Sequence, residues 1–411
     1  MTRRVTSSWM MLAGGVLLFV VVPLALFLPR PKAGVNPWEH VPQRAAPTDH
    51  SNLLPGPYET PQEVTRACLE CHPDAAHEVM QTSHWTWLSD PQWARWLGKE
   101  IQIGKKNAIN NFCIGIQGNW PGCTRCHVGY GWKDANFDFE NPENVDCLAC
   151  HADMTTYAKG KAGMPLDSID LTAAAQSVGG PPTRYNCGKC HFNGGGGNAV
   201  KHGDLDESLY VPEPELDVHM GKHDMLCVDC HTAEDHRIKG HALSFAIEYG
   251  DQVQCADCHT DRPHEDDRLN DHTDAVACQT CHVPYVAPKW PTKVWWDWST
   301  AGRDDIPENH YTYLKIKGSF RYKKNFVPEY YWWNGTVRYR YLLGDPIDPE
   351  KPTMINPPDG SIHDPNAKIW PFKIHRGRQP YDTEYKILLQ PWTVGEGAFW
   401  DAFDWEVALR E

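Results

Sequence analysis

Cys68-Leu69-Glu70-Cys71-His72 is the first of seven copies of the pattern Cys-x-x-Cys-His in this chain. The copies are Cys68/Cys71/His72, Cys123/Cys126/His127, Cys147/Cys150/His151, Cys187/Cys190/His191, Cys227/Cys230/His231, Cys255/Cys258/His259 and Cys278/Cys281/His282. This pattern is the attachment site of c-type haem: both cysteine sulfurs bond covalently to the porphyrin, and the histidine binds the iron from one face. The sequence therefore predicts seven covalently bound haem c groups.

Two other uses of paired cysteines are less consistent with the pattern. Zinc and iron–sulfur sites need cysteine pairs that converge, and they have no use for a histidine after every second cysteine. Disulfides are common outside the cytoplasm, but they do not require the histidine either. Seven repeats of one five-residue pattern favour haem over both.

Composition restricts the partners and the kind of core. The chain has 411 residues and a formal net charge of −14, which argues against nucleic acid as a partner. Only 41% of residues are hydrophobic, although there are 18 tryptophans. We expect the chain to wrap its haems, with aromatic side chains covering the porphyrin edges.

The first 32 residues contain an apolar run from Trp9 to Leu28, which is long enough to span a bilayer as a helix. A cleaved signal peptide usually has a shorter apolar core and a small-residue cleavage site. We therefore predict an uncleaved signal-anchor over residues 1–32. Because haem is attached to such motifs outside the cytoplasm, the prediction is a single-pass protein of the cytoplasmic (inner) membrane with its haem domain on the periplasmic side.

The rest of the chain divides at the last motif. Residues 33–282 are predicted to form a multihaem c-type cytochrome domain, and residues 283–411 an aromatic-rich C-terminal region packed on it. The predicted fold class is mainly α with much irregular coil, wrapped around a haem array, plus one N-terminal transmembrane helix. In the C-terminal region, residues 313–320 and 335–341 have strand-like composition, and residues 398–409 are expected to be helical.

A low-spin haem needs a second axial ligand, and histidine is the first candidate. Seven of the 21 histidines belong to the motifs, so 14 remain for seven irons. Nine of these 14 lie between the first and last motifs, which favours them as ligands. Two axial histidines close an iron to substrate, whereas a catalytic haem keeps one face open or holds a displaceable ligand.

Two residues do not fit the pattern of paired ligands. Cys113 is the one cysteine outside the motifs, and it is either an inert or intermolecularly bonded thiol or a thiol beside the second haem. Lys201 follows the four glycines of residues 194–197, which suit a loop pressed against another surface. Most lysines are solvated, but a buried one can lose its proton and become a ligand or a proton donor.

Several long stretches outside the haem motifs resemble the octahaem tetrathionate reductase family. They are Gly104-Lys105-Lys106-Asn107, Ile109 to Ile114, Cys123 to Trp132, Gly194 to Asp204, Trp295 to Gly302 and Ile369 to Lys373. The resemblance extends from about Pro61 to Glu406. It implies a multihaem fold related to nitrite and hydroxylamine enzymes.

The resemblance also implies particular roles. One haem of the family has a lysine in place of its second histidine, with a cysteine sulfur nearby. These roles fall on the haem of Cys123/Cys126/His127, on Lys201 and on Cys113, which would be the catalytic residues. The second histidines implied for the other haems are His84, His202, His219, His236, His264 and His272. This chain has no eighth haem motif and carries a predicted anchor, so a redox partner protein could supply the continuing haem.

Two functions follow from these expectations. The first is a reductase of a small inorganic substrate, namely tetrathionate, nitrite or hydroxylamine, at the lysine-ligated haem. The second is a non-catalytic electron carrier that relays electrons from a membrane quinol-oxidising partner to a periplasmic or extracellular acceptor. A haem with Lys201 at or near the iron favours the reductase, and two histidines at all seven haems favour the carrier.

Overall fold

The computed structural model describes residues 36–109 and 115–410. Its helices are short, and the longest, α3, has nine residues. The α-helices are α3 (Pro61–Leu69), α4 (Ala75–Met80), α5 (Ser83–Thr86), α6 (Trp120–Cys123), α7 (Leu148–His151), α8 (Leu171–Gln176), α9 (Arg184–His191), α10 (Cys227–Cys230), α11 (Ala256–His259), α12 (Asp267–His272), α13 (Cys278–His282), α14 (Phe399–Ala402) and α15 (Trp405–Ala408).

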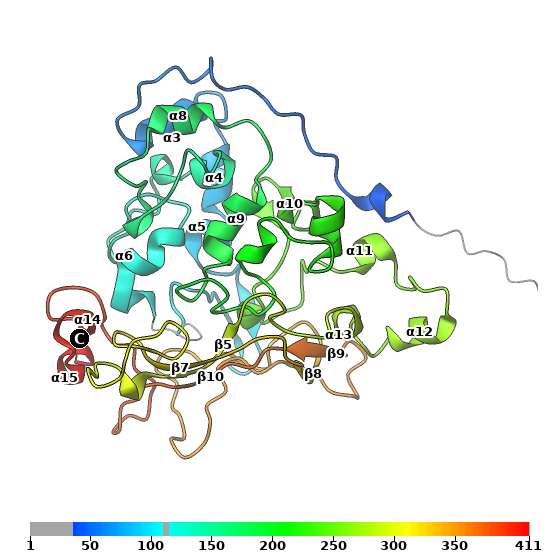
Figure 1. Ribbon diagram of the computed structural model, residues 1–411, viewed down its shortest axis with the longest axis vertical. Helices are drawn as coiled ribbons and strands as arrows, with labels where there is room; N and C mark the ends of the chain where they lie inside the picture. The colour runs from blue at the N-terminus through cyan, green and yellow to red at the C-terminus, as the bar shows by residue number, and fades with distance from the viewer. Residues whose placement is uncertain (1–35, 110–114, 411) are drawn as a thin grey trace, which may run out of the picture.

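The strands lie in four small sheets. They are β1 (Gln92–Ala94), β2 (Lys99–Ile101), β3 (Ala233–Glu234), β4 (Arg237–Ile238), β5 (Thr292–Asp297), β6 (Tyr313–Leu314), β7 (Gly318–Lys323), β8 (Glu329–Trp333), β9 (Lys368–Phe372) and β10 (Arg376–Arg378). The largest sheet has the order β10-β5-β7-β6, and the other pairs are β1-β2, β3-β4 and β8-β9. Figure 1 shows most of the helices that carry the motifs on one side and the C-terminal strands on the other, with α13 of the seventh motif beside β9.

Each haem motif that lies in an α-helix occupies about one helical turn, and this explains why the helices are short. In several motifs the histidine N–H donates to the carbonyl of the first cysteine, four residues back: His72 to Cys68, His151 to Cys147 and His259 to Cys255 are examples. Residues three and four apart lie on one face of a helix. The turn therefore presents both sulfurs and the imidazole on the same side.

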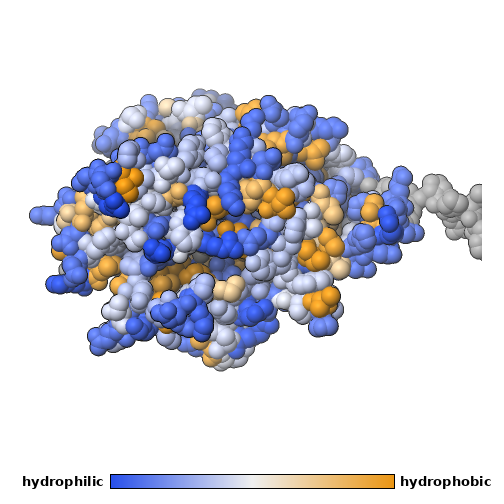
Figure 2. Space-filling view, turned by 60° about the horizontal axis from the view of Figure 1, so that its bottom comes forward, coloured by the Kyte–Doolittle hydropathy of each residue, from blue (hydrophilic) through white to orange (hydrophobic). Residues whose placement is uncertain are grey.

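The apolar contacts form several small clusters instead of one core. One cluster joins Trp296, Phe320 and Phe399 beneath the C-terminal sheet, and a second joins Leu54, Leu148 and their neighbours around the first and third motifs. Others surround Trp85, Ile103 and Trp132. Figure 2 shows hydrophobic side chains in small groups separated by hydrophilic ones on the face that it draws. This arrangement agrees with a chain that encloses cofactors.

The predicted fold class is wrong in two respects. The described residues hold ten strands, several of them in the layer that covers the motif helices, so the protein is not mainly α. The strands form because β-branched and aromatic residues fill positions such as Thr292 to Trp296, where the haem motifs no longer dictate helical turns.

The added transmembrane helix is the second correction. Among residues 36–109 and 115–410, no helix has the length and apolar character needed to cross a bilayer. The run from Trp9 to Leu28, on which the predicted anchor over residues 1–32 rested, lies outside the described residues.

The C-terminal expectations have mixed outcomes. Residues 313–320, which have strand-like composition, contain β6 and the start of β7, and these two strands pair antiparallel. Residues 335–341 make only an isolated bridge between Val337 and Pro358. The expected helix over residues 398–409 is divided into α14 and α15, because Phe403 has a left-handed backbone (φ 52°) that ends the first helix.

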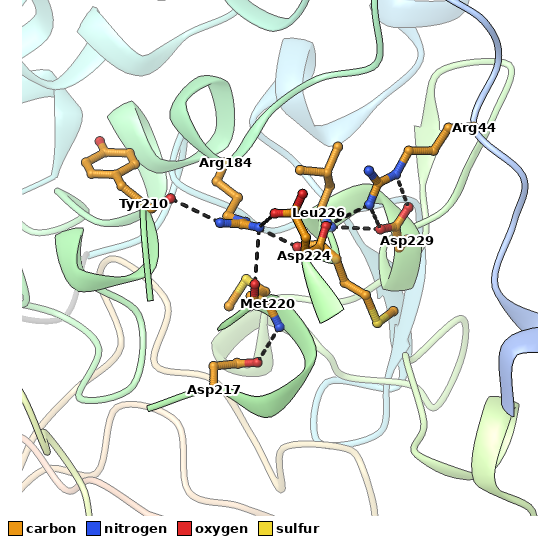
Figure 3. A network of polar contacts seen from close by, with 9 residues as sticks. Arg44, Arg184, Tyr210, Asp217, Met220, Asp224, Leu226 and Asp229 are labelled. Carbon is orange, nitrogen blue, oxygen red and sulfur yellow. Dashed lines mark hydrogen bonds and ion pairs between the residues drawn. The ribbon is translucent and has the colours of Figure 1, made fainter. Parts of the chain in front are cut away.

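A buried arginine ties the fourth motif to the loop that precedes the fifth. Arg184, at the start of α9, donates to the carbonyl oxygens of Tyr210 (3.2 Å), Met220 (3.2 Å) and Met225 (3.2 Å). It also pairs with Asp224, and Figure 3 shows the guanidinium at the centre of this network. The Arg184 guanidinium thus donates hydrogen bonds to three backbone carbonyl oxygens of one irregular loop.

The N-terminal segment is held on the same loop. Arg44 donates from Nε to Asp229 (3.1 Å) and from NH2 to the Asp224 carbonyl (3.0 Å). The segment runs over the outside of the helical layer before it reaches α3 (Figure 1). The two residues that this attachment joins, Arg44 and Asp229, are 185 residues apart in the sequence.

We expect Arg184→Met to destabilise the protein by about 3 kcal/mol, because it leaves buried carbonyl oxygens without donors. Thermal unfolding of the haem-loaded protein measures the loss. Lys324→Met, at an exposed position outside the haem motifs, is the control and should unfold at the wild-type temperature. Equal midpoints for the two variants would contradict the structural role given to Arg184.

Candidate haem-binding cavity

The central motifs surround one continuous cavity of about 2620 Å³. Its wall includes the cysteine and histidine side chains of the second to fifth motifs, namely Cys126, His127, Cys150, His151, Cys187, Cys190, His191, Cys227 and His231. A pocket for one small molecule usually measures about 300–1,000 Å³. The cavity is therefore large enough for several cofactors side by side.

The first and sixth motifs lie away from this cavity, and the seventh meets it only through Gln279. The cysteines and histidines of these three motifs do not line it: Cys68, Cys71, His72, Cys255, Cys258, His259, Cys278, Cys281 and His282. Cys258 is half-buried and acts electrostatically on Cys230 of the fifth motif, whereas Cys281 is exposed in α13. The structure thus does not bring Cys258 and Cys281 together with the cavity-lining cysteines. Their role in haem attachment stays a prediction, and haems held there would lie nearer the surface.

Four motif histidines face a second histidine across a gap of nearly constant width. The ring centroids are 6.2 Å apart for His191 and His84, 6.4 Å for His151 and His236, 5.9 Å for His259 and His219, and 6.1 Å for His282 and His264. Two metal–imidazole bonds of about 2 Å each, with the two ring radii added, separate the centroids by roughly 6 Å. Each pair therefore fits one metal ion between its rings, as a bis-histidine haem requires.

Sulfurs of different motifs also lie against one another. Hydrogen-bond contacts join the thiols of Cys68 and Cys147, Cys126 and Cys190, Cys187 and Cys227, and Cys255 and Cys278. These sulfurs stand where thioether links to haem would form. Because neighbouring motifs are in contact, the haem sites follow one another closely enough for electrons to pass between them.

The second motif has different surroundings. The His127 ring is fully buried and lies among Trp85, Trp87, Trp132, Phe137 and Phe139, with centroids 4.7–6.1 Å away. Its Nε2 lies 2.7 Å from the carbonyl oxygen of Trp85. A carbonyl on one ring nitrogen is the usual support of a histidine that binds metal through the other nitrogen.

Lys201 lines the same cavity as Cys126 and His127. Its backbone is held from the opposite layer: Lys373, which directly follows β9, donates from Nζ to the carbonyl oxygens of Val200 (3.0 Å) and Lys201 (2.9 Å). Burial lowers the pKa of Lys373 to about 7. The glycine loop that leads to Lys201 turns through Gly195 and Gly196, which have φ values of 103° and 92° that favour glycine.

Several lysines make this part of the cavity electropositive, although the protein as a whole is acidic. Lys105 stacks over the Trp87 ring (5.1 Å) and Lys106 over the Phe139 ring (3.8 Å). Lys159 donates to the His127 carbonyl (2.6 Å) and pairs with the buried carboxylate of Asp146. These lysines were not among the predicted site residues, although Lys105 and Lys106 lie in a stretch that resembles the reductase family.

Two further polar groups face the cavity beside Lys201. Burial and the charges of Lys201 and Lys373 lower the pKa of His202 to about 3, so its imidazole is neutral. Burial raises the pKa of the Asp204 carboxyl, which favours its protonated form. Both side chains have accessible surface because they open onto the cavity.

Three of the predicted ligands and catalytic residues are not shown at a haem motif. His202 lines the cavity and His272 ends α12, but in the described part neither ring lies opposite a motif histidine at the spacing of the four pairs. Cys113 lies outside the described residues. The distal-ligand assignments and the catalytic roles of Lys201 and Cys113 therefore stay predictions.

His50 is a candidate ligand that the sequence did not single out. Its Nδ1 bonds the carbonyl oxygens of Thr48 (2.9 Å) and Val178 (3.0 Å), which leaves the other nitrogen for a metal. His50 and His72 both act electrostatically on His151, so all three rings belong to one region. Histidines between the first and last motifs were favoured, and His50 precedes the first.

Comparisons with known proteins agree with this site. Residues 67–152 match the family model described as cytochrome c554 and c-prime, and residues 293–411 match the model described as bacterial cytochrome c. The crystal structure of an octahaem cytochrome c from Shewanella oneidensis is 46% identical, with a TM-score of 0.82 over 88% of this chain and 82% of that one. An uncharacterised protein of Archaeoglobus fulgidus is 28% identical over 238 residues, which are 46% of this chain and 79% of the relative.

The fold and the motifs thus define a protein that binds haem covalently at several sites. The chain belongs to the multihaem c-type cytochromes and resembles the octahaem cytochrome over most of its length. The predicted cofactor type, covalent haem c, is confirmed. The number seven is the number of motifs in the sequence and stays a prediction for the number of haems.

We expect His219→Ala to convert one haem from low-spin to high-spin, because His219 faces the motif histidine His259 and no other described histidine faces that ring at this spacing. Electron paramagnetic resonance of the oxidised protein counts the low-spin centres. His363→Ala, at an exposed position, should leave that count unchanged. An unaltered spectrum of the His219 variant would remove this residue from the ligand set.

Proposed function

We propose that this multihaem cytochrome is a reductase of a small inorganic anion. Its seven motifs would hold seven haems, and its catalytic centre would be the haem of the second motif. Lys201 and Cys113 would act at that centre, while the histidine pairs serve the haems that carry electrons to it. The family resemblance makes tetrathionate and nitrite the first substrates to test, with hydroxylamine as a third.

The observation that carries this proposal is the contrast between the second motif and four others. His151, His191, His259 and His282 each face a histidine at about the separation of a bis-histidine iron. His127 instead lies among aromatic rings, and Lys201 lines the same cavity. A lysine is a more displaceable ligand than a second histidine, and substrate needs such a position.

The haem at this motif would supply electrons to the substrate, and the side chains would do the rest. Lys105, Lys106 and Lys159 supply positive charge around the motif and would attract and hold an anion. Asp204, whose pKa burial raises, can donate a proton within the cavity, and so can the ammonium form of Lys201. Reduction of an oxyanion or a sulfur oxyanion consumes protons, so such donors are needed.

The local charge favours two of the three substrates. Nitrite and tetrathionate are anions, whereas hydroxylamine is uncharged at neutral pH. The protein has a net charge of −14, so an electropositive site inside it opposes the overall potential. The site therefore attracts anions specifically, and we place tetrathionate and nitrite ahead of hydroxylamine.

A non-catalytic electron carrier is the second candidate, and the four histidine pairs favour it. Such pairs close an iron to substrate and suit electron transfer. If a histidine also completed the second-motif haem, no open iron would be left, and the protein would relay electrons between a donor and an acceptor. Either function needs a redox partner protein, and covalent haem attachment places the domain outside the cytoplasm.

We expect Lys201→Ala to lower turnover of the preferred anion by about 100-fold or more, because it removes a proton donor and a ligand. The visible spectrum of one haem should shift while the others keep theirs. Lys201→Arg keeps the charge but cannot lose its proton, so it should also be impaired. Lys133→Ala, at an exposed position, is the control. An unchanged spectrum with full activity in Lys201→Ala would support the carrier.

We expect the double variant Lys105→Gln/Lys106→Gln to raise KM for nitrite or tetrathionate about tenfold, since each lost charge weakens the attraction for an anion. KM for hydroxylamine should change little. Steady-state kinetics with all three substrates at low ionic strength makes the comparison. Parallel increases for the neutral and the charged substrates would show that the lysines act through structure and not through charge.

A further inference from the structure

A hairpin presents His236 to the third motif. β3 and β4 pair through Glu234 and Arg237, so Asp235 and His236 form a two-residue turn. Both have positive φ, 46° and 60°. Such turns normally contain Gly, Asn or Asp, and histidine is among the side chains that tolerate positive φ. The turn brings the His236 ring to 6.4 Å from that of His151.

Two ion pairs fix the arm of the hairpin that follows its tip. Arg237 pairs with Asp90 (3.2 Å), and Lys239 pairs with Asp257 (2.8 Å). These contacts join the hairpin to the start of the β1 segment and to the sixth motif. His236 is therefore held in place by its backbone and by its neighbours, independently of what its own ring contacts.

One ring nitrogen of His236 has a carboxylate partner. Nδ1 lies 2.7 Å from Oε2 of Glu78, and both side chains are about one-third exposed, 36% and 31%. Glu78 belongs to α4, which follows the first motif. A carboxylate is a stronger acceptor than a carbonyl, and it increases the electron donation of a ligating imidazole.

Other candidate ligands have weaker partners. Nδ1 of His231 contacts the Lys239 carbonyl (2.9 Å), and Nδ1 of His50 contacts two backbone carbonyls. His236 differs from these two in that its partner is a carboxylate. The third motif is thus distinguished by the electronic support of its second ligand.

We propose that Glu78 sets the reduction potential of the haem held by Cys147, Cys150 and His151, and lowers it through His236. A negatively charged acceptor on the imidazole stabilises the ferric state relative to the ferrous state. This haem is therefore harder to reduce than it would be with a carbonyl partner. The inference rests on the proposed role of His236 as a haem ligand.

The position of this haem gives the lower potential a consequence. The thiol of Cys147 contacts Cys68 of the first motif, and Cys150 interacts electrostatically with Cys187 and Cys190 of the fourth. The third motif thus lies between the first and the fourth. Because the haem between them is harder to reduce, electrons would pass less readily between the haem of the first motif and the haems of the second and fourth motifs.

The test is a potentiometric titration of the full-length haem-loaded protein, followed by visible and paramagnetic resonance spectra. In Glu78→Gln, one midpoint should rise so that the ratio of reduced to oxidised haem at a fixed potential increases about tenfold, equivalent to about 59 mV for one electron. The other midpoints should stay in place. Glu78→Asp keeps the carboxylate and should recover part of the shift.

Glu234→Gln is the matched control, because it removes one exposed negative charge from β3 of the same hairpin and keeps the Glu78 contact and the Arg237–Asp90 pair. A midpoint shift in Glu234→Gln as large as in Glu78→Gln would overturn the inference, as would no shift in Glu78→Gln. His236→Ala separates the two levels of the argument. If it leaves every haem low-spin, the ligand assignment itself fails; if it converts one haem while Glu78→Gln shifts nothing, only the role of Glu78 fails.

Discussion

Covalent attachment at a single helical turn is the constraint from which the architecture follows. A turn such as Cys147 to His151 needs only five residues to offer two sulfurs and an imidazole, so it requires no long helix around it. Several such turns, brought into contact through their sulfurs, leave large internal spaces instead of a continuous apolar core. The chain then needs elements whose task is to enclose these spaces, and the C-terminal strands and the N-terminal segment take that part (Figure 1).

The sequence was most informative where chemistry is local. The motif fixes its own cofactor and its first ligand, and the hairpin at β6 and β7 is encoded by neighbouring residues. The second ligands are different, because a pair such as His84 and His191 is separated by more than 100 residues of chain. Family resemblance supplied His84, His219, His236 and His264, whereas spacing alone left 14 histidines for seven irons. His50 was missed because its position before the first motif says nothing about where the segment folds back.

The strands were underestimated for a related physical reason. In β9, Ile369, Trp370 and Phe372 favour a strand while Lys368 and Pro371 do not, so the strand depends on the pairing of Ile369 with Trp332 and its bridge to Val276 near the seventh motif. These partners are distant in sequence. Such pairing is determined by tertiary contact, which composition does not reveal.

The distribution of charge links the fold to the proposed chemistry. An acidic surface around covalent haems suits partner recognition and solubility, while Lys105, Lys106 and Lys159 lie around the second motif and Lys201 lines the same cavity. Several contacts keep these cations in place: Asp146 for Lys159, aromatic rings for Lys105 and Lys106, and the Lys373 contacts for the backbone of Lys201. A carrier would have no need of these contacts, since histidine pairs suffice to move electrons. The grouping of lysines along this cavity is most simply explained if an anion is bound there.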